Sequence, residues 1–175
     1  MGFSFVLYLH YQNTTMLVDY NSLPETAKVW IYPSNRKFYE NEIDGLHEKI
    51  KVFLENWKAD DANFQVSYQL LYNRFIVFFA DAESPLVNAD IDASVLFILQ
   101  LQQDYKVELL DKMNVCFKQG EFVQYKDLKD FKKLLKNRAV TGKSIVFDNL
   151  VTTKEEFENY WEVPISESWY GRFLK

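Results

Sequence analysis

The sequence has few of the residues from which disulfides and closed zinc sites are made. Its 175 residues include one cysteine, Cys116, and two histidines, His10 and His47. A single cysteine excludes an intrachain disulfide, and three such side chains cannot form a closed zinc site of Cys and His ligands. Within the apolar run "NVCF", Cys116 is typical of a small buried hydrophobic residue. This cysteine usage predicts a reducing, cytoplasmic compartment.

Long apolar runs and excess positive charge are also scarce. The N-terminal run in "MGFSFVLYLHY" is far shorter than the roughly 20 residues of a membrane helix, and no basic flank or cleavage site marks a signal peptide. We therefore expect no membrane insertion. The formal net charge is −5, which disfavours nucleic acid as a partner because a polyanion is repelled. Ordinary domain sequence begins at Met16, so we expect residues 1–16 to be an extension from a start assigned too early, with Met16 as the native first residue.

Apolar and aromatic residues are abundant instead. Hydrophobic residues make up 48% of the chain, with 15 Phe and 11 Tyr against 5 Gly and 4 Pro, which predicts a folded chain. A chain of this mass buries roughly 70% of its unfolded surface. The seam near residues 109–114 is too short for an independent linker. We expect two lobes that share an interface, comprising residues 17–112 and 113–175.

Alternating and helical patterns predict the elements of the first lobe. "KVWIY" is predicted to be a strand, followed by a helix from about residue 39 to residue 58. "NFQVSYQLLYNRFIVFFAD" is predicted to be a hairpin that turns near Asn73, because Asn tolerates positive φ. Its second strand, "RFIVFFA", is nearly all apolar and should be central and covered on at least one face. The helix at residues 39–58 is predicted to have an inner face of Ile43, Leu46, Ile50, Phe53, Leu54 and Trp57, with His47 at its border.

A second long helix is predicted over "ASVLFILQLQQDY". Asp90 or Asp92 can cap its N-terminus, because a carboxylate accepts hydrogen bonds from free backbone amides. Helical spacing predicts an inner face of Val95, Ile98, Leu99, Gln102 and Tyr105.

The second lobe is predicted to contain a hairpin around Gly120, the helix "KDLKDFKKLLKNR" with its lysines in solvent, and the strand "SIVFDN". The aromatic C-terminal tail should pack onto the body, because exposed aromatics favour aggregation. The element order is β-α-β-β-α-β, then β-α-β and the tail. It predicts an α+β fold whose first lobe is ferredoxin-like. In the second lobe, the helix "KDLKDFKKLLKNR" is predicted to turn Leu128, Phe131, Leu134 and Leu135 inward.

Residues 137–144, "NRAVTGKS", contain the second half of a phosphate-binding loop, G-x-x-x-x-G-K-[ST]. Asn137 stands where the motif requires its first glycine. A helix is predicted before the segment and a strand after it, which reverses the order that directs helix N-terminal amides at an anion. We predict a turn that leaves the helix, with Gly142 near the C-cap, and no ATP site.

No catalytic, cofactor or metal site is predicted. Carboxylates before the second long helix can hold Mg²⁺ or act as acid and base, but helix capping and solvent exposure account for them. An arginine at the end of an element can clamp a carboxylate or a phosphate. An alternative ligand site between the lobes would use Arg36, Arg74, Asp90 and Asp92.

Five segments resemble an uncharacterised family of bacterial proteins, mostly from Bacteroidetes, whose automatic label is "ABC transporter ATPase". They are "KVWIYPSNR", "YNRFIVF", "IDASVLFI", "IVFDNLVTTK" and "WEVPISESWYGRFL". The sequence has no complete Walker A motif, no LSGGQ-like signature and no Walker B motif followed by Glu. The resemblance therefore implies a family and no ATPase mechanism.

Residues from "NVCFKQGEFVQY" to "YWEVP" resemble the GYF-type module, a hairpin, helix, turn and strand followed by Trp. Members of that class bind proline-rich peptides on an aromatic surface, a mode that suits a preformed polyproline helix. The Gly-Pro-Phe and Gly-Tyr-Phe hallmarks are absent here, so the resemblance bears on the fold more than on the ligand. The peptide-binding candidates that it implies are Phe122, Tyr125, Tyr160 and Trp161, whose alternative role is to close a core.

The leading hypothesis is therefore a cytoplasmic α+β protein that binds a protein or peptide and is not an enzyme. The rival hypothesis is a small-molecule-binding protein or enzyme with its site between the lobes. A flat, exposed aromatic strip would favour the first, and an enclosed pocket lined by arginines and carboxylates would favour the second.

Overall fold

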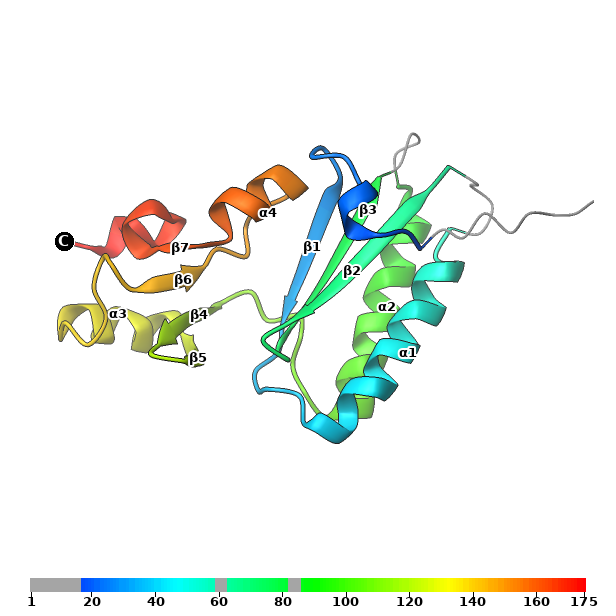
Figure 1. Cartoon of the computed structure of the whole chain (residues 1–175). Coiled ribbons are helices and arrows are strands. Elements are labelled where there is room, and N and C mark those ends of the chain that lie inside the picture. Colours follow the sequence, from blue (N-terminus) through cyan, green and yellow to red (C-terminus); the bar gives the residue numbers. More distant parts are fainter. Residues whose placement is uncertain (1–16, 59–62, 82–85) are drawn as a thin grey trace, which may run out of the picture.

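The computed structural model describes residues 17–58, 63–81 and 86–175. The expected start at Met16 lies outside them. The first lobe is a three-stranded antiparallel sheet in the order β1-β3-β2, and two long helices cover one face of it (Figure 1). Its elements are β1 (Lys28–Pro33), α1 (Glu40–Asn56), β2 (Gln65–Leu71), β3 (Phe75–Asp81) and α2 (Asn88–Tyr105), preceded by a 3₁₀ turn, η1 (Tyr20–Ser22).

The central strand β3 is buried on both faces of its sheet. Side chains alternate along a strand, so Ile76 and Phe78 pack toward α1 and α2, while Phe75 and Phe79 pack toward the second lobe. This arrangement confirms that "RFIVFFA" is a covered central strand. The turn before it holds Asn73 at φ 47°, as predicted.

The second lobe is a four-stranded antiparallel sheet in the order β5-β4-β6-β7. Phe131 and Tyr170 pack against one face of it and close a separate core. The hairpin turns at Gly120 (φ 59°), and the tail folds back onto the lobe, as expected. The elements are β4 (Asn114–Gln119), β5 (Phe122–Asp127), α3 (Leu128–Lys136), β6 (Ile145–Phe147), α4 (Lys154–Tyr160), β7 (Glu162–Pro164), η2 (Ile165–Glu167) and η3 (Trp169–Phe173).

These two sheets with their helices confirm an α+β fold. The sixth predicted element of the first lobe, β4, pairs with β5 and β6 in the second sheet. The free edge of β1 is met instead by the segment before α4, where the Val29 amide donates to the Thr152 carbonyl at 3.0 Å and Lys28 forms an antiparallel bridge with Thr153. The more specific descriptions, ferredoxin-like and GYF-like, are not confirmed by this topology.

The second long helix differs from its prediction in start and orientation. It begins at Asn88, and Asp90 lies in its first turn, where the carboxylate accepts the Val87 amide at 3.0 Å. Neither Asp90 nor Asp92 is the N-cap. The buried face comprises Ser94, Ile98 and Leu101, whereas Val95 and Leu99 of the predicted inner face are 36% and 38% exposed.

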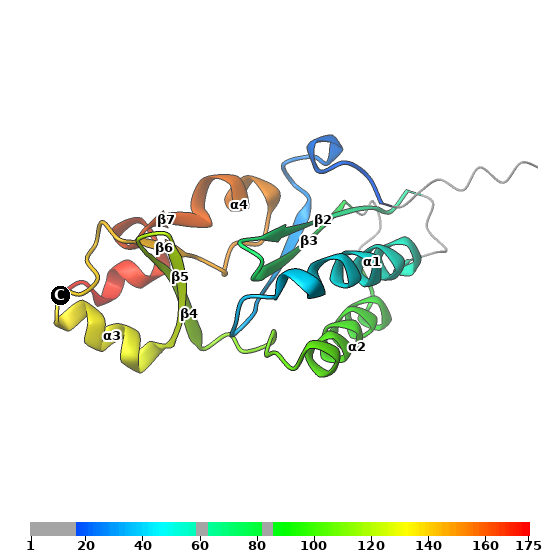
Figure 2. The same cartoon turned by 60° about the horizontal axis from the view of Figure 1, so that its bottom comes forward.

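A shared aromatic core joins the lobes, which lie side by side along the long axis of the molecule (Figure 2). Phe75 of β3 lies 4.7 Å from Phe147 and 5.1 Å from Trp161, measured between ring centroids. Cys116 is buried in the same cluster, as expected. Because the cluster takes residues from both sheets, the lobes form one packed unit.

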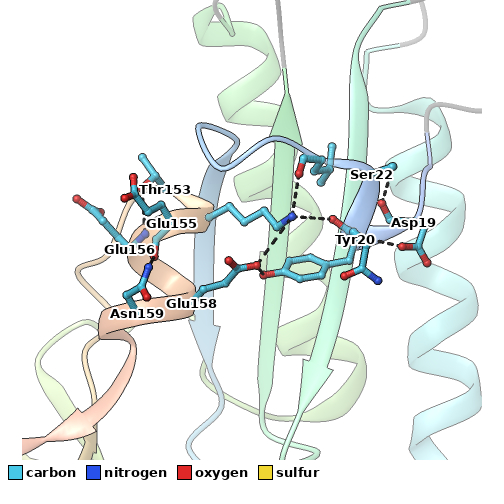
Figure 3. A network of polar contacts seen from close by, with 11 residues as sticks. Asp19, Tyr20, Ser22, Thr153, Glu155, Glu156, Glu158 and Asn159 are labelled. Atoms are coloured by element: carbon cyan, nitrogen blue, oxygen red, sulfur yellow. Dashed lines mark hydrogen bonds and ion pairs between the residues drawn. The ribbon is translucent and has the colours of Figure 1, made fainter.

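A buried lysine fastens the N-terminal end of the first lobe to α4. The ammonium group of Lys154 donates to the Leu23 carbonyl at 2.8 Å and to the Tyr20 carbonyl at 3.2 Å. The Tyr20 hydroxyl donates to Glu158 of α4 at 2.7 Å (Figure 3). Polar contacts therefore reinforce the aromatic core at this end of the interface. Within the described ranges, no helix is both long and apolar enough to cross a membrane.

Candidate binding surfaces

Three of the four backbone amides of the Thr141–Ser144 turn donate to oxygen atoms of the turn itself. The Thr141 amide donates to the Ser144 hydroxyl at 2.9 Å, and the Ser144 amide donates to the Thr141 carbonyl at 3.0 Å. The Lys143 amide donates to the Thr141 hydroxyl at 3.3 Å. Strand β6, and not a helix, follows the turn, and the first amides of η2 already donate to its carbonyls, Ile165 to Ser144 at 2.8 Å and Ser166 to Gly142 at 3.0 Å. The amides are therefore not arranged to bind a phosphate.

Gly142 does not end α3, contrary to the prediction. The left-handed residue after the helix is Arg138, at φ 56°. Gly142 instead lies under the tail, where a Cβ atom would come within 3.2 Å of Leu174 Cδ1. Its amino-acid type is explained by that close approach.

The four aromatic peptide-binding candidates occupy different surroundings. Phe122 at the start of β5 is 73% exposed, and Tyr160 at the end of α4 is also exposed. The hydroxyl of Tyr125 accepts a hydrogen bond from the Asn114 amide group at 3.0 Å. Trp161 is only 4% exposed, and its ring stacks on Phe157 within the core between the lobes. Among the described residues, no ring contact or hydrogen bond joins any two of the four.

The alternative ligand site is divided between the two ends of α2. Arg36 donates to both carboxylate oxygens of Glu42 at 2.9 Å and to the carbonyl of Tyr105, the last residue of the helix. This pairing lowers the pKa of the Glu42 carboxyl. Asp90 lies in the first turn of the same 18-residue helix, about 22 Å from Tyr105 at 1.5 Å per residue. The structure therefore does not bring Arg36 together with Asp90 or Asp92.

Arg74, the remaining member of that set, lines a groove between the lobes. The groove has a volume of about 430 Å³ and lies between the β2–β3 turn and the β4–β5 hairpin. Arg74 is half-buried, and burial lowers the pKa of its guanidinium. One nitrogen donates to the Ser34 carbonyl at 3.2 Å. The other lining residues are Lys37, Tyr72, Asn73, Glu121, Phe122 and Val123.

A larger groove of about 650 Å³ runs between α1 and α2 on the side away from the sheet. Phe53 and Phe97 stack in it with ring centroids 4.2 Å apart, and Trp57 extends this apolar surface. Val52 borders the groove and is 59% exposed. An ion pair between Lys49 and Asp104, 2.7 Å long, crosses from one helix to the other. The groove is thus mainly aromatic and apolar, with charged groups at its rim.

Helix α2 has apolar residues on its outer side as well as on its buried side. Leu96 is 66% exposed and neighbours Ala93 and Gln100, which line the groove, at helical spacing. Ile91, Val95 and Leu99 are also exposed. We define the α1–α2 surface as the groove together with Leu96. Sequence reasoning missed it because the run "VLFILQL" was assigned a single inner face.

The lysines of α3 lie in solvent, as predicted. They border a third groove of about 550 Å³ that also contains Met113 and Leu128. Lys133 pairs with Asp130 at 3.1 Å, and Lys132 lies over the Phe173 ring at 4.3 Å from its centroid. The described residues contain no group of three or more His, Cys, Asp or Glu side chains that could hold a metal ion.

No protein-family model, curated protein or solved structure matches the chain. The functional argument therefore depends on the geometry of these surfaces.

Proposed function

We propose that this protein is a non-catalytic binding module whose α1–α2 surface binds an apolar segment of a partner protein. The observation that carries the proposal is the open groove floored by Phe53 and Phe97 and flanked by exposed Val52 and Leu96. Exposed apolar residues that gather beside a groove are typical of interaction surfaces.

The groove favours an amphipathic helix as the bound segment. Two roughly parallel helix walls leave an elongated depression, and a helix fills such a depression with residues at i, i+3, i+4 and i+7. Asp and Glu outnumber Lys and Arg in residues 17–112, and Glu48 and Asp104 lie at the rim, where each is paired with a lysine of α1. A partner helix with lysines or arginines beside its apolar face fits this charge.

The proposal extends to the type of each lobe and to the family of the chain. The order β1-β3-β2 with both helices on one face is compatible with a ferredoxin-like lobe that lacks its fourth strand. The hairpin, helix and strand of residues 113–175 are compatible with a GYF-like lobe. We propose a cytoplasmic member of the bacterial family named above, for which the ATPase label is unsuitable because three amides of the Thr141–Ser144 turn are bonded within it.

Titration with a designed helical peptide tests the proposed function. The probe is about 16 residues long, has Leu at i, i+3, i+4 and i+7, and has Lys on its other face; a scrambled peptide of identical composition is the control. Fluorescence anisotropy should show saturable, micromolar binding of the probe alone. Equal binding of both peptides would contradict the proposal. A concentration-dependent dimer that excludes the probe would assign the surface to a second copy of the chain instead.

A further inference from the structure

We infer that the groove between the β2–β3 turn and the β4–β5 hairpin is a binding site for a monocarboxylate that carries an apolar or aromatic group. Arg74 is its anchor. The guanidinium is half-buried and has one hydrogen bond, to the neutral carbonyl of Ser34 at 3.2 Å. No Asp or Glu oxygen of the described residues lies within 4.0 Å of it, whereas Arg36 is paired with Glu42 through both nitrogens.

Within the described residues no carboxylate pairs directly with Arg74, although Glu121 lines the same groove. Its electrostatic neighbours in the interface are the Cys116 thiol and the Tyr125 phenol. Burial raises the pKa of each to about 12, so both are uncharged near neutral pH. A half-buried cation without an anion is costly to keep in a protein, because its hydration is lost without a compensating charge. An external anion supplies the missing partner.

The turn that carries Arg74 is held in an unusual backbone conformation. Tyr72 and Asn73 have φ values of 55° and 47°, and the left-handed region is unfavourable for a bulky residue such as tyrosine. The Tyr72 hydroxyl donates to Glu162 of the second lobe at 2.7 Å, and the ammonium of Lys118 lies 5.0 Å from the centre of its ring. Positive φ at both central residues is typical of a two-residue hairpin turn, and the contacts of Tyr72 with the second lobe fix one wall of the groove.

The remaining lining residues indicate the class of ligand. The planar guanidinium matches the two oxygens of a carboxylate, and Lys37 adds a second positive charge at the groove. Glu121 offsets one of these charges, which favours a monoanion over a phosphate dianion. Phe122, 73% exposed, offers an aromatic face to the body of the ligand. A volume of about 430 Å³ suits a small molecule or the last residues of a peptide.

The test is an NMR titration of the ¹⁵N-labelled protein with N-acetylphenylalanine, with N-acetylphenylalanine amide as the neutral matched control. We expect shifts centred on the amides of Asn73, Arg74, Phe122 and Val123 for the acid and none for the amide. A tetrapeptide ending in Phe, with either a free or an amidated C-terminus, distinguishes a peptide terminus from a free small molecule: the source that binds more tightly is the one the groove is shaped for.

Variants separate recognition from folding. Arg74→Gln should weaken binding of the acid about tenfold or more, while Arg172→Gln, which alters an exposed arginine in the tail, should leave it unchanged. Arg74→Gln should not lower the melting temperature, because it removes an uncompensated charge. If that variant fails to fold, Phe122→Ala replaces it, since the ring is exposed and its loss should weaken binding without unfolding the chain. Equal shifts with acid and amide, or wild-type affinity in these variants, would overturn the inference. Val52→Glu, which alters the α1–α2 surface, should leave binding of the acid unchanged. The carboxylate site and the proposed α1–α2 surface can therefore fail independently of each other.

Discussion

Phe53 of α1 and Phe97 of α2 stack face to face, with ring centroids 4.2 Å apart and ring planes inclined by 4°. Phe53 also lies 5.5 Å from Trp57 and 6.0 Å from Phe78 of the central strand. The floor of the α1–α2 groove is therefore an extension of the core and is fixed by it. A preformed apolar floor lowers the ordering cost of binding, which is why we place the main interaction surface there.

Val52→Glu should abolish binding of the helical probe peptide while leaving the fold intact. The new carboxylate would be desolvated against the leucine face of the probe, whose lysines lie on the opposite face. Because Val52 is 59% exposed, the free energy of unfolding should change by no more than about 0.5 kcal/mol. Anisotropy titration and urea unfolding measure the two effects.

Leu150→Glu is the matched control for that substitution. Leu150 is 56% exposed in the loop between β6 and α4, so its variant gains the same charge at a similar exposure on the other lobe. It should bind the probe as the wild type does. Equal losses in the two variants would show that net charge, and not the groove, controls binding.

Lys154→Ala should lower the free energy of unfolding by about 3 kcal/mol. The change removes a buried ammonium group and its bond to the Leu23 carbonyl, whereas the Tyr20 carbonyl keeps the Leu23 amide as a donor. Urea denaturation monitored by tryptophan fluorescence gives the value. Lys143→Ala, in an exposed turn, should stay within about 0.5 kcal/mol of the wild type; a similar effect of both changes would show that the polar contacts between η1 and α4 do not stabilise the interface.

Stability should be lost at alkaline pH through Tyr32. Burial raises the pKa of its phenol to about 12 in the folded protein, against about 10 in an unfolded chain. Below pH 10 the Tyr32 phenol is protonated in both the folded and the unfolded chain, so its ionisation does not reduce the free energy of unfolding. Between pH 10 and 12 only the unfolded chain ionises, so the free energy of unfolding falls by about 1.4 kcal/mol per pH unit for this residue.

The measurement is urea unfolding of the wild type and Tyr32→Phe at pH 7 and pH 11. Relative to the wild type, Tyr32→Phe should have a higher free energy of unfolding at pH 11 than at pH 7, because phenylalanine cannot ionise. A difference that is the same at both pH values would refute the assignment of the alkaline loss to Tyr32.

ATP should not bind at the Thr141–Ser144 turn. A ligand at 100 times its Kd stabilises a folded protein by about 2.7 kcal/mol, which a thermal melt detects readily. We expect the melting temperature to be the same with and without millimolar Mg-ATP, in both the wild type and Lys143→Ala. An ATP-dependent rise that disappears in Lys143→Ala would show that the turn binds nucleotide despite its internally bonded amides.

Local patterns in the sequence predicted the elements whose burial is set by their own periodicity. The inner faces of α1 and α3 agree with the structure at Leu46, Ile50 and Phe131, which are fully buried. The face of α2 could not be chosen locally, because apolar residues surround that helix and only contacts with the sheet select Ile98 and Leu101. Helix α4 was missed although Thr153 and Glu156 have the spacing of a helix start, with the Thr153 hydroxyl accepting the Glu156 amide.

The candidate surfaces were harder to predict than the fold. Phe122 and Arg74 were singled out for different functions, yet they line the same groove, because the packing of one hairpin against another is a long-range property. Trp161 was a peptide-binding candidate with core closure as its alternative role, and contacts with Phe75 and Phe147 place it in the core. The sheet that β4 joins is likewise set by contacts distant in sequence.

Site-specific photo-crosslinking in the native cell tests the central claim most directly. Benzoylphenylalanine replaces Val52 in one sample and Leu150 in the other, and mass spectrometry identifies the residues captured. We predict that position 52 alone captures a protein segment with apolar residues at helical spacing and flanking lysines or arginines. Capture of the same proteins from both positions, or of no such segment from position 52, would contradict the account.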